Sequence, residues 1–258
     1  MNNIDLNEWL SSTSTNLFVA KEYFHHHAYE ILNTHSALKK DFLDSLNASI
    51  PIKARIKKTG TFKSKAIEAK ELNKEIRILL KTIPKNDIKL EVLEERGVFY
   101  FSSEKNAIGG FDFAIINHRK NLIALRNLCF GQIQYHDGGK RWNNFLEKNI
   151  ELKTLAAKYL DVNDIGNDLI YSKDENDMPL IVGEIQFGNW ALAYRDFFKV
   201  LKANVQNSID CLVYIVPTGD LESMLSDGIV TYDKTVKILE EFAKVISVPV
   251  WVVGIDIK

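Results

Sequence analysis

Cysteine and long apolar runs are scarce in this sequence. The two cysteines, Cys129 and Cys211, lie far apart, so a disulfide framework is excluded and both are expected to be buried thiols in a reducing compartment. No stretch approaches the roughly 18 apolar residues of a membrane-spanning helix. The first residues show neither the basic nor the apolar segment of a secretion signal. We therefore expect a cytoplasmic protein without a membrane partner.

Several enzyme motifs are also missing. The chain has no phosphate-cradling glycine loop and no nucleophile elbow, which argues against nucleotide hydrolysis and α/β-hydrolase chemistry. His118 and His136 have no cysteine or histidine partner nearby, so a zinc site is not expected.

The net charge of −1 conceals an asymmetry between the two parts of the chain. Residues 161–258 hold 16 acidic and 8 basic side chains, which leaves about seven positive charges in excess over residues 1–160. Much of that excess lies in residues 53–70, where the only acid is Glu68. The segment is predicted to bind DNA phosphates, with a solvated charged face as the alternative. The predicted DNA-binding cations are Lys53, Arg55, Lys57, Lys58, Lys63 and Lys65.

Hydrophobic periodicity predicts an α/β fold. Helical spacing is found over residues 15–32, 36–46, 64–81, 143–160, 190–205 and 232–246, and strand-like runs over 98–101, 111–116, 168–171, 180–187, 211–216 and 248–255. Strands that alternate with helices indicate a mixed sheet with helices on its faces. We expect a mainly helical, basic DNA-gripping region over residues 1–95 and a catalytic core over 96–258, joined in one continuous globular unit.

The strand over residues 180–187 carries two polar side chains where a core strand should be apolar. Alternation places Glu184 and Gln186 on the same face. Because burying an unpaired carboxylate costs several kcal/mol, this pattern is better explained by chemistry than by folding. The alternative is a structural acid that pairs with an arginine or lysine.

A divalent cation is the chemistry that these residue types favour. Mg²⁺ prefers hard oxygen ligands, and one or two carboxylates are enough to anchor it. Glu184 and the backbone carbonyl of Ile185 can supply two ligands, and Gln186 would position the attacking water. Asp168 is the favoured second carboxylate, because it opens a strand that can form a hairpin with residues 180–187. Asp112 is the main rival, an acid in a strand-like run after Gly109 and Gly110, and the fallbacks are Asp164 and Asp177.

Residues 137–144 form a second candidate DNA contact. They combine Lys140 and Arg141 with Trp142 and two asparagines after a glycine pair, which are types that contact bases and phosphates. The segment is predicted to be a recognition loop, and an ordinary surface loop is the equally plausible alternative.

Asp168, followed by the segment Glu184-x-Gln186-Phe-Gly and then a helix, resembles the signature of the PD-(D/E)XK nuclease superfamily. That superfamily has an acid on one strand and Glu-x-Lys on the next, and Gln186 stands where lysine is usual. A glutamine at this position is similar to the BglII/BstYI branch of type II restriction endonucleases. The resemblance implies a restriction-endonuclease-like fold and a homodimer that cuts palindromic double-stranded DNA with Mg²⁺, with catalysis by Asp168, Glu184 and Gln186. The alternatives are a repair or recombination nuclease of the same fold, and a non-catalytic nucleic-acid-binding protein.

Overall fold

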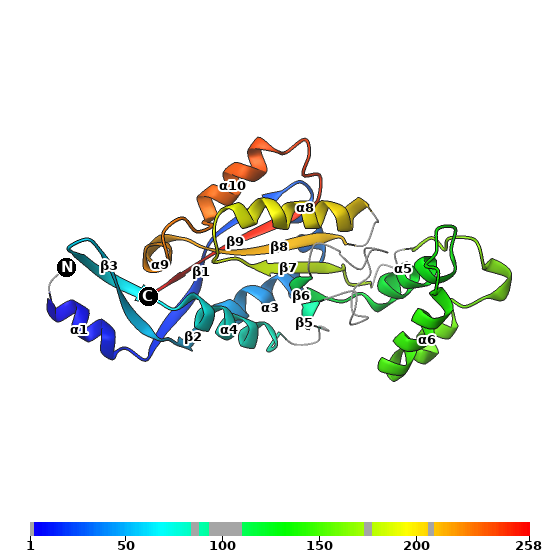
Figure 1. The fold of residues 1–258 in the computed structure, drawn as a ribbon, viewed down its shortest axis with the longest axis horizontal. Coiled ribbons are helices and arrows are strands. Elements are labelled where there is room, and N and C mark those ends of the chain that lie inside the picture. Colours follow the sequence, from blue (N-terminus) through cyan, green and yellow to red (C-terminus); the bar gives the residue numbers. More distant parts are fainter. Residues whose placement is uncertain (1–2, 84–87, 93–109, 173–176, 206–208) are drawn as a thin grey trace.

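A twisted seven-stranded mixed sheet forms the centre of the molecule (Figure 1). The computed structural model describes residues 3–83, 88–92, 110–172, 177–205 and 209–258. Listed across the sheet, the strands are β2 (Ala48–Pro51), β1 (Ser14–His25), β9 (Val250–Ile257), β8 (Cys211–Pro217), β7 (Ile181–Ile185), β6 (Phe111–Ile115) and β5 (Ile88–Val92). The predicted α/β class is confirmed. The predicted strand over residues 98–101 lies outside the described residues.

The three central strands are parallel and apolar. β7 pairs with β8 and β8 with β9 in parallel, whereas the outer strands pair antiparallel. Every residue of β7 and β8 is buried, as expected for strands that are covered on both faces. β8 and β9 could be predicted from the sequence because each is a nearly continuous apolar run.

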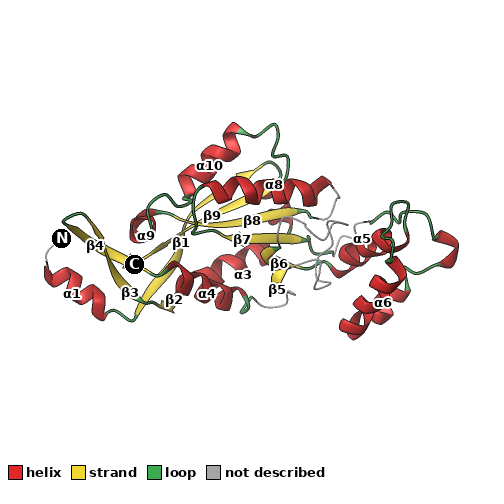
Figure 2. Ribbon diagram, viewed as in Figure 1, coloured by secondary structure: helices red, strands yellow, loops and turns green. Residues whose placement is uncertain are grey.

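Helices cover both faces of this sheet (Figure 2). One face carries α8 (Ala191–Val205) and α10 (Tyr232–Glu241), and the other carries α3 (Ser36–Leu46) and α4 (Ala69–Leu80). Each layer has its own buried cluster. On α4, for example, the buried stripe is Leu72, Ile76 and Leu80 at helical spacing. The remaining helices near the sheet are α1 (Asn3–Ser11), α2 (Ala28–Thr34) and α9 (Gly219–Met224).

The N-terminal region is less helical than predicted. The helix expected over residues 15–32 is wrong, because residues 14–25 form β1 and only α2 follows. β1 pairs with β2 on one side and with β9 on the other, and this long-range pairing overrides the local helical spacing. The sheet therefore crosses the predicted boundary between residues 95 and 96. The basic segment also differs: β3 (Ala54–Thr59) and β4 (Phe62–Ile67) form a separate hairpin, and α4 begins only at Ala69.

A helical arm, residues 117–168, projects from the opposite end of the molecule to this hairpin (Figure 1). It is inserted between β6 and β7 and contains α5 (His118–Phe130), α6 (Gly138–Lys148) and α7 (Lys153–Ala157), with short 3₁₀ turns at Ile150–Leu152 and Val162–Asp164. It has a buried cluster of its own, built around Trp142 and Phe145. At its base, Lys120 pairs with Asp210 at 2.7 Å. None of the described helices is long and apolar enough to cross a membrane.

Candidate active site at the β6–β7 edge

The antiparallel pair β6 and β7 brings two carboxylates to the same end of the sheet. Phe113 lies opposite Gly183, so Asp112 and Glu184 occupy the next positions toward the carboxyl end of β7. The Ile185 amide donates to Asp112 Oδ2 at 2.8 Å. The close approach requires the glycine, because a Cβ on Gly183 would lie 2.0 Å from the Phe113 ring. Asp112, which the sequence offered as the alternative to Asp168, is therefore the aspartate beside Glu184.

Asp168 has a different setting. The hairpin predicted between residues 168–171 and 180–187 is wrong, because residues 168–172 form no strand and β7 pairs with β6 and β8. Asp168 Oδ1 accepts from the Gln132 amide at 3.0 Å within the helical arm. That arm joins the ends of β6 and β7 that lie away from Asp112 and Glu184 (Figure 1). Of the two fallbacks, Asp177 is bound by Arg119 at the base of the arm at 2.7 Å, and Asp164 lies in the arm itself.

Glu184 is buried, with 5% of the residue exposed, and it faces α8. Its Oε1 forms an ion pair with Lys199 of α8, which is also buried. Burial raises the pKa of Glu184 to about 8; Lys199 opposes that rise, and Asp112 and Asp196 add to it. The ion pair expected of a structural acid is therefore present. Glu184 stands in a group of three carboxylates, in which Arg77 pairs with Asp112 and Arg195 with Asp196.

Gln186 is held by a buried network behind the strand. Its Nε2 donates to Asp196 Oδ2 at 2.7 Å, and its Oε1 accepts from the Gly188 amide at 2.8 Å. Asp196 is fully buried and also accepts from the Tyr214 hydroxyl at 3.1 Å. Burial and the Asp196 carboxylate raise the pKa of Tyr214 well above its usual value. The amide of Gln186 is therefore fixed in one orientation.

Two polar residues of α4 complete the site, and the sequence analysis missed both. Arg77 Nη2 binds Asp112 Oδ1 at 2.6 Å, and Asn73 Nδ2 donates to the carbonyl of Ile185 at 3.2 Å. Burial raises the pKa of Asp112, while the Ile185 amide and Arg77 lower it. Asn73 and Arg77 lie one turn apart beside the buried stripe of α4, and Arg77 Nε donates to Asn73 Oδ1 at 2.6 Å. This polar pair at i and i+4 was the available signal.

The site offers a donor set that suits a hard cation. It consists of the Asp112 and Glu184 carboxylates and the Ile185 carbonyl, and each of these holds a cation or an N–H donor from the chain. Two carboxylates and a carbonyl are sufficient for Mg²⁺, which keeps several waters. Among the residues that the structure describes, there is no cluster of three or more histidine, cysteine, aspartate or glutamate side chains suited to a metal. The fit of the site to Mg²⁺ therefore depends on two carboxylates and on water ligands.

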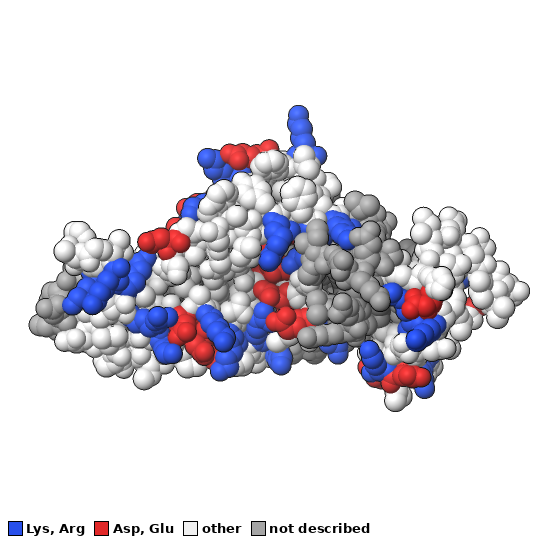
Figure 3. All heavy atoms as spheres, in the orientation of Figure 1, with Lys and Arg blue, Asp and Glu red and all other residues white. Residues whose placement is uncertain are grey.

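The predicted DNA-binding cations of residues 53–65 lie on the β3–β4 hairpin and its approach. Lysine and arginine side chains gather toward this end of the face seen in Figure 3. Lys58 and Lys63 are exposed and lie opposite each other across the hairpin. Lys53 pairs with Glu68 at 3.1 Å, and Lys65 lies over the Trp9 ring at 5.4 Å. The turn at Gly60 has a φ of +61°, and Phe62 beside it is 80% exposed.

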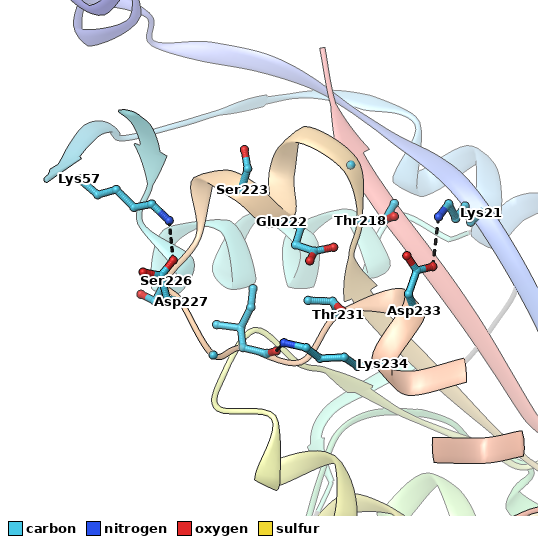
Figure 4. A pocket seen from close by; sticks show the side chains of 13 residues that line it. Lys21, Lys57, Thr218, Glu222, Ser223, Ser226, Asp227, Thr231, Asp233 and Lys234 are labelled. Atoms are coloured by element: carbon cyan, nitrogen blue, oxygen red, sulfur yellow. Dashed lines mark hydrogen bonds and ion pairs between the residues drawn. The ribbon is translucent and has the colours of Figure 1, made fainter. Parts of the chain in front are cut away.

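The contacts of Lys57 differ from those of its neighbours on the hairpin. Its Nζ binds Asp227 and the Leu225 carbonyl, each at 3.0 Å, and so ties the hairpin to the loop between α9 and α10. A cavity of about 570 Å³ lies there (Figure 4). Three lysines and three acids line it, and Figure 4 shows Lys57–Asp227 and Lys21–Asp233 as pairs. Its charges balance, so it has no excess positive charge for a phosphate.

Lys140 and Arg141 do not lie on a loop. The loop predicted over residues 137–144 is wrong, because residues 138–148 form α6, which packs against α5; the contact of these cations with DNA stays a prediction. Arg141 Nε binds Asp137 at 2.8 Å, and its guanidinium lies 3.9 Å from the centre of the Tyr135 ring. Both cations therefore belong to the helical arm, at the far end of the molecule from the β3–β4 hairpin (Figure 1).

The fold is a mixed sheet with helices on both faces, and two carboxylates lie at one end of neighbouring strands. The sequence model of the restriction endonuclease BglII/BglIII family matches residues 20–255. The chain belongs to this family and is a DNA endonuclease of the type II restriction class.

Two solved structures are similar to the chain at low identity. The crystal structure of restriction endonuclease BglII complexed with a DNA 16-mer is 14% identical, with a TM-score of 0.45, over 91% of this chain and 76% of that one. The structure of free BglII is 12% identical, with a TM-score of 0.40, over 91% of this chain and 77% of that one. No curated protein sequence matches the chain.

Proposed function

We propose that the protein is a Mg²⁺-dependent homodimer that cuts both strands of a palindromic DNA sequence at the β6–β7 site. The observation that carries this proposal is the placement of Asp112 and Glu184 on neighbouring strands, with the Ile185 amide bound to Asp112. Membership of a restriction endonuclease family supplies the substrate class. The geometry supports assigning the chemistry to this edge of the sheet and not to the arm that holds Asp168.

Asp112, Glu184 and the Ile185 carbonyl would hold the cation. When bound, Mg²⁺ supplies Lewis-acid activation of the phosphodiester and of the attacking water. Gln186 cannot act as a base at neutral pH, and its two hydrogen bonds to Asp196 and Gly188 fix its place beside the site. Asn73 and Arg77 hold the Ile185 carbonyl and Asp112 in position from α4.

Binding of DNA would rest on the β3–β4 hairpin. Lys58 and Lys63 are the exposed pair best placed to meet phosphates, because both lie on the β3–β4 hairpin, and this hairpin is at the opposite end of the molecule from the helical arm (Figure 1). Neutralising phosphates releases condensed counterions, so the affinity of such a hairpin for DNA should fall steeply with salt.

An exposed aromatic face on α8 and α10 supports the homodimer. Phe198 is 65% exposed, Trp190 48% and Phe242 41%, and Val245 beyond α10 is 60% exposed. An apolar hollow of about 430 Å³ lies between the two helices. Tyr194 joins Trp190 and Phe242 through ring contacts at 5.8 and 6.1 Å, and exposed apolar patches of this kind are typical of protein interfaces. Two copies related by a twofold axis would present two identical sites to a palindrome.

A cleavage assay tests the proposed function. Purified protein is incubated with plasmid and phage DNA in Mg²⁺ or in EDTA, and the fragment ends are sequenced. Discrete fragments that share a palindromic end sequence and are absent in EDTA are expected. A smear, or cleavage of branched substrates alone, would indicate a repair nuclease. Retained DNA binding without cleavage would indicate a non-catalytic binding protein. Either result contradicts the proposal.

A further inference from the structure

Lys199 is a buried lysine beside Glu184. Its side chain is only 4% exposed, although lysine is almost never buried unless it is paired. The ammonium binds Glu184 Oε1, donates to the Gly110 carbonyl at 2.8 Å and lies 3.7 Å from Asp196 Oδ1. It also lies 4.7 Å from the centre of the Phe111 ring. Four groups from three elements therefore hold this one cation against the carboxylate of β7.

The site lacks a cation at the position where its motif would place one. In the Glu-x-Lys arrangement the strand itself provides a lysine two residues after the glutamate, and here that residue is Gln186. Gln186 shares the face of Glu184, and its amide is turned to Asp196 and Gly188. Asp196 and Lys199 are three residues apart on α8, so one helical face supplies both the partner of Gln186 and the cation at Glu184.

We propose that Lys199 replaces the strand lysine as the positioning residue of the site. It reaches Glu184 from α8 and holds Oε1, which leaves the second oxygen of the carboxylate for the cation. The inference rests on the proposed function, because it assigns Lys199 a role only in a site that cleaves DNA.

Fixing one Glu184 oxygen has a catalytic consequence. A preorganised cation at the site is worth more than one in water, because the site excludes solvent and the charge needs no reorganisation during the reaction. Gln186 carries no charge, so its amide can serve to position the attacking water. A lysine at position 186 would place a second ammonium near Lys199, and the two would compete for the same carboxylate.

The test moves the lysine back to the strand. Lys199→Met is compared with Gln186→Lys/Lys199→Met, and Lys40→Met on the exposed surface of α3 is the control. We expect Lys199→Met to cleave DNA about 10²-fold more slowly, in the range of a lost outer partner of a metal ligand, while Mn²⁺ binding, followed calorimetrically without DNA, is as tight as in the wild type or tighter. We expect the double variant to recover at least tenfold of the lost rate, and Lys40→Met to behave as the wild type.

Each other result overturns the inference. Wild-type rates in Lys199→Met would show that the ammonium is dispensable. A lost rate without recovery in the double variant would show that Lys199 only supports the fold. If Lys199→Met fails to fold, Lys199→Gln, which can still donate a hydrogen bond, takes its place in both variants with the same criteria. Failure of the proposed function is distinguishable, because the wild type itself would then not cleave DNA in Mg²⁺.

Discussion

Replacing Asp112 by asparagine tests which aspartate serves the site. The substitution keeps the shape of the side chain and the acceptor for the Ile185 amide, but it removes one of the two carboxylate charges at this edge of the sheet. One pair of unit charges 4 Å apart at a partly buried position is worth about 4 kcal/mol, which corresponds to about 10³-fold in rate. We therefore expect Asp112→Asn to slow cleavage by about three orders of magnitude.

The matched control is Asp168→Asn, which changes the same atoms on the helical arm. Asp168 accepts one hydrogen bond, from the Gln132 amide, and an asparagine oxygen can still accept it. Because this bond is kept and Asp168 lies away from Asp112 and Glu184, cleavage should stay within about twofold of the wild type, a change of less than about 0.5 kcal/mol in the activation free energy. Both variants are assayed by single-turnover cleavage of a labelled duplex, with thermal unfolding to verify the fold. A large loss in Asp168→Asn with a near-normal Asp112→Asn would refute the assignment.

Three further predictions concern stability, DNA binding and assembly. Because burial raises the pKa of Glu184 from 4.5 to about 8, the folded state keeps a proton there that the unfolded chain has lost; this stabilisation is complete below pH 4.5 and is lost as pH rises through 8. The free energy of unfolding by urea, measured in EDTA, should therefore fall between pH 5 and pH 8.5 by more in the wild type than in Glu184→Gln. An equal fall in the two proteins would contradict this prediction. Lys58→Ala/Lys63→Ala should lower the slope of log affinity against log salt by up to about 2 in a fluorescence titration with a duplex, and an unchanged slope would show that the hairpin does not meet phosphates. Phe198→Asp should convert the proposed dimer to a monomer in sedimentation velocity, whereas Phe62→Asp, which alters a still more exposed aromatic residue of the hairpin, should not; a wild type that is already monomeric would contradict the homodimer.

Sequence patterns predicted the elements whose environment is locally uniform. β8 and β9 up to Ile255 are apolar because both faces are covered, and α8 and α10 have one apolar face, so their periodicity is visible in the sequence. Glu184 and Gln186 were recognisable because a polar pair on such a strand conflicts with burial.

Long-range pairing could not be predicted in this way. β1 is a strand because β2 and β9 flank it, and its own residues show a helical spacing. Asp168 was preferred to Asp112 because it lies nearer to Glu184 in sequence, but the helical arm separates β6 from β7 along the chain, and the sheet joins them. Asn73, Arg77 and Lys199 reach the site from helices, so only the packing of the helices on the sheet shows their role.

Glu184→Gln offers the most direct test of the claim that the β6–β7 edge cleaves DNA. Glutamine is the better replacement than alanine, because removing the side chain would leave the buried Lys199 ammonium without its partner, at a cost of about 3–5 kcal/mol. Cleavage in Mg²⁺ and duplex binding without Mg²⁺ are measured on the same preparations of wild type and variant. The account predicts that the variant binds DNA as the wild type does and produces no cleavage. A variant that cleaves at the wild-type rate would contradict it.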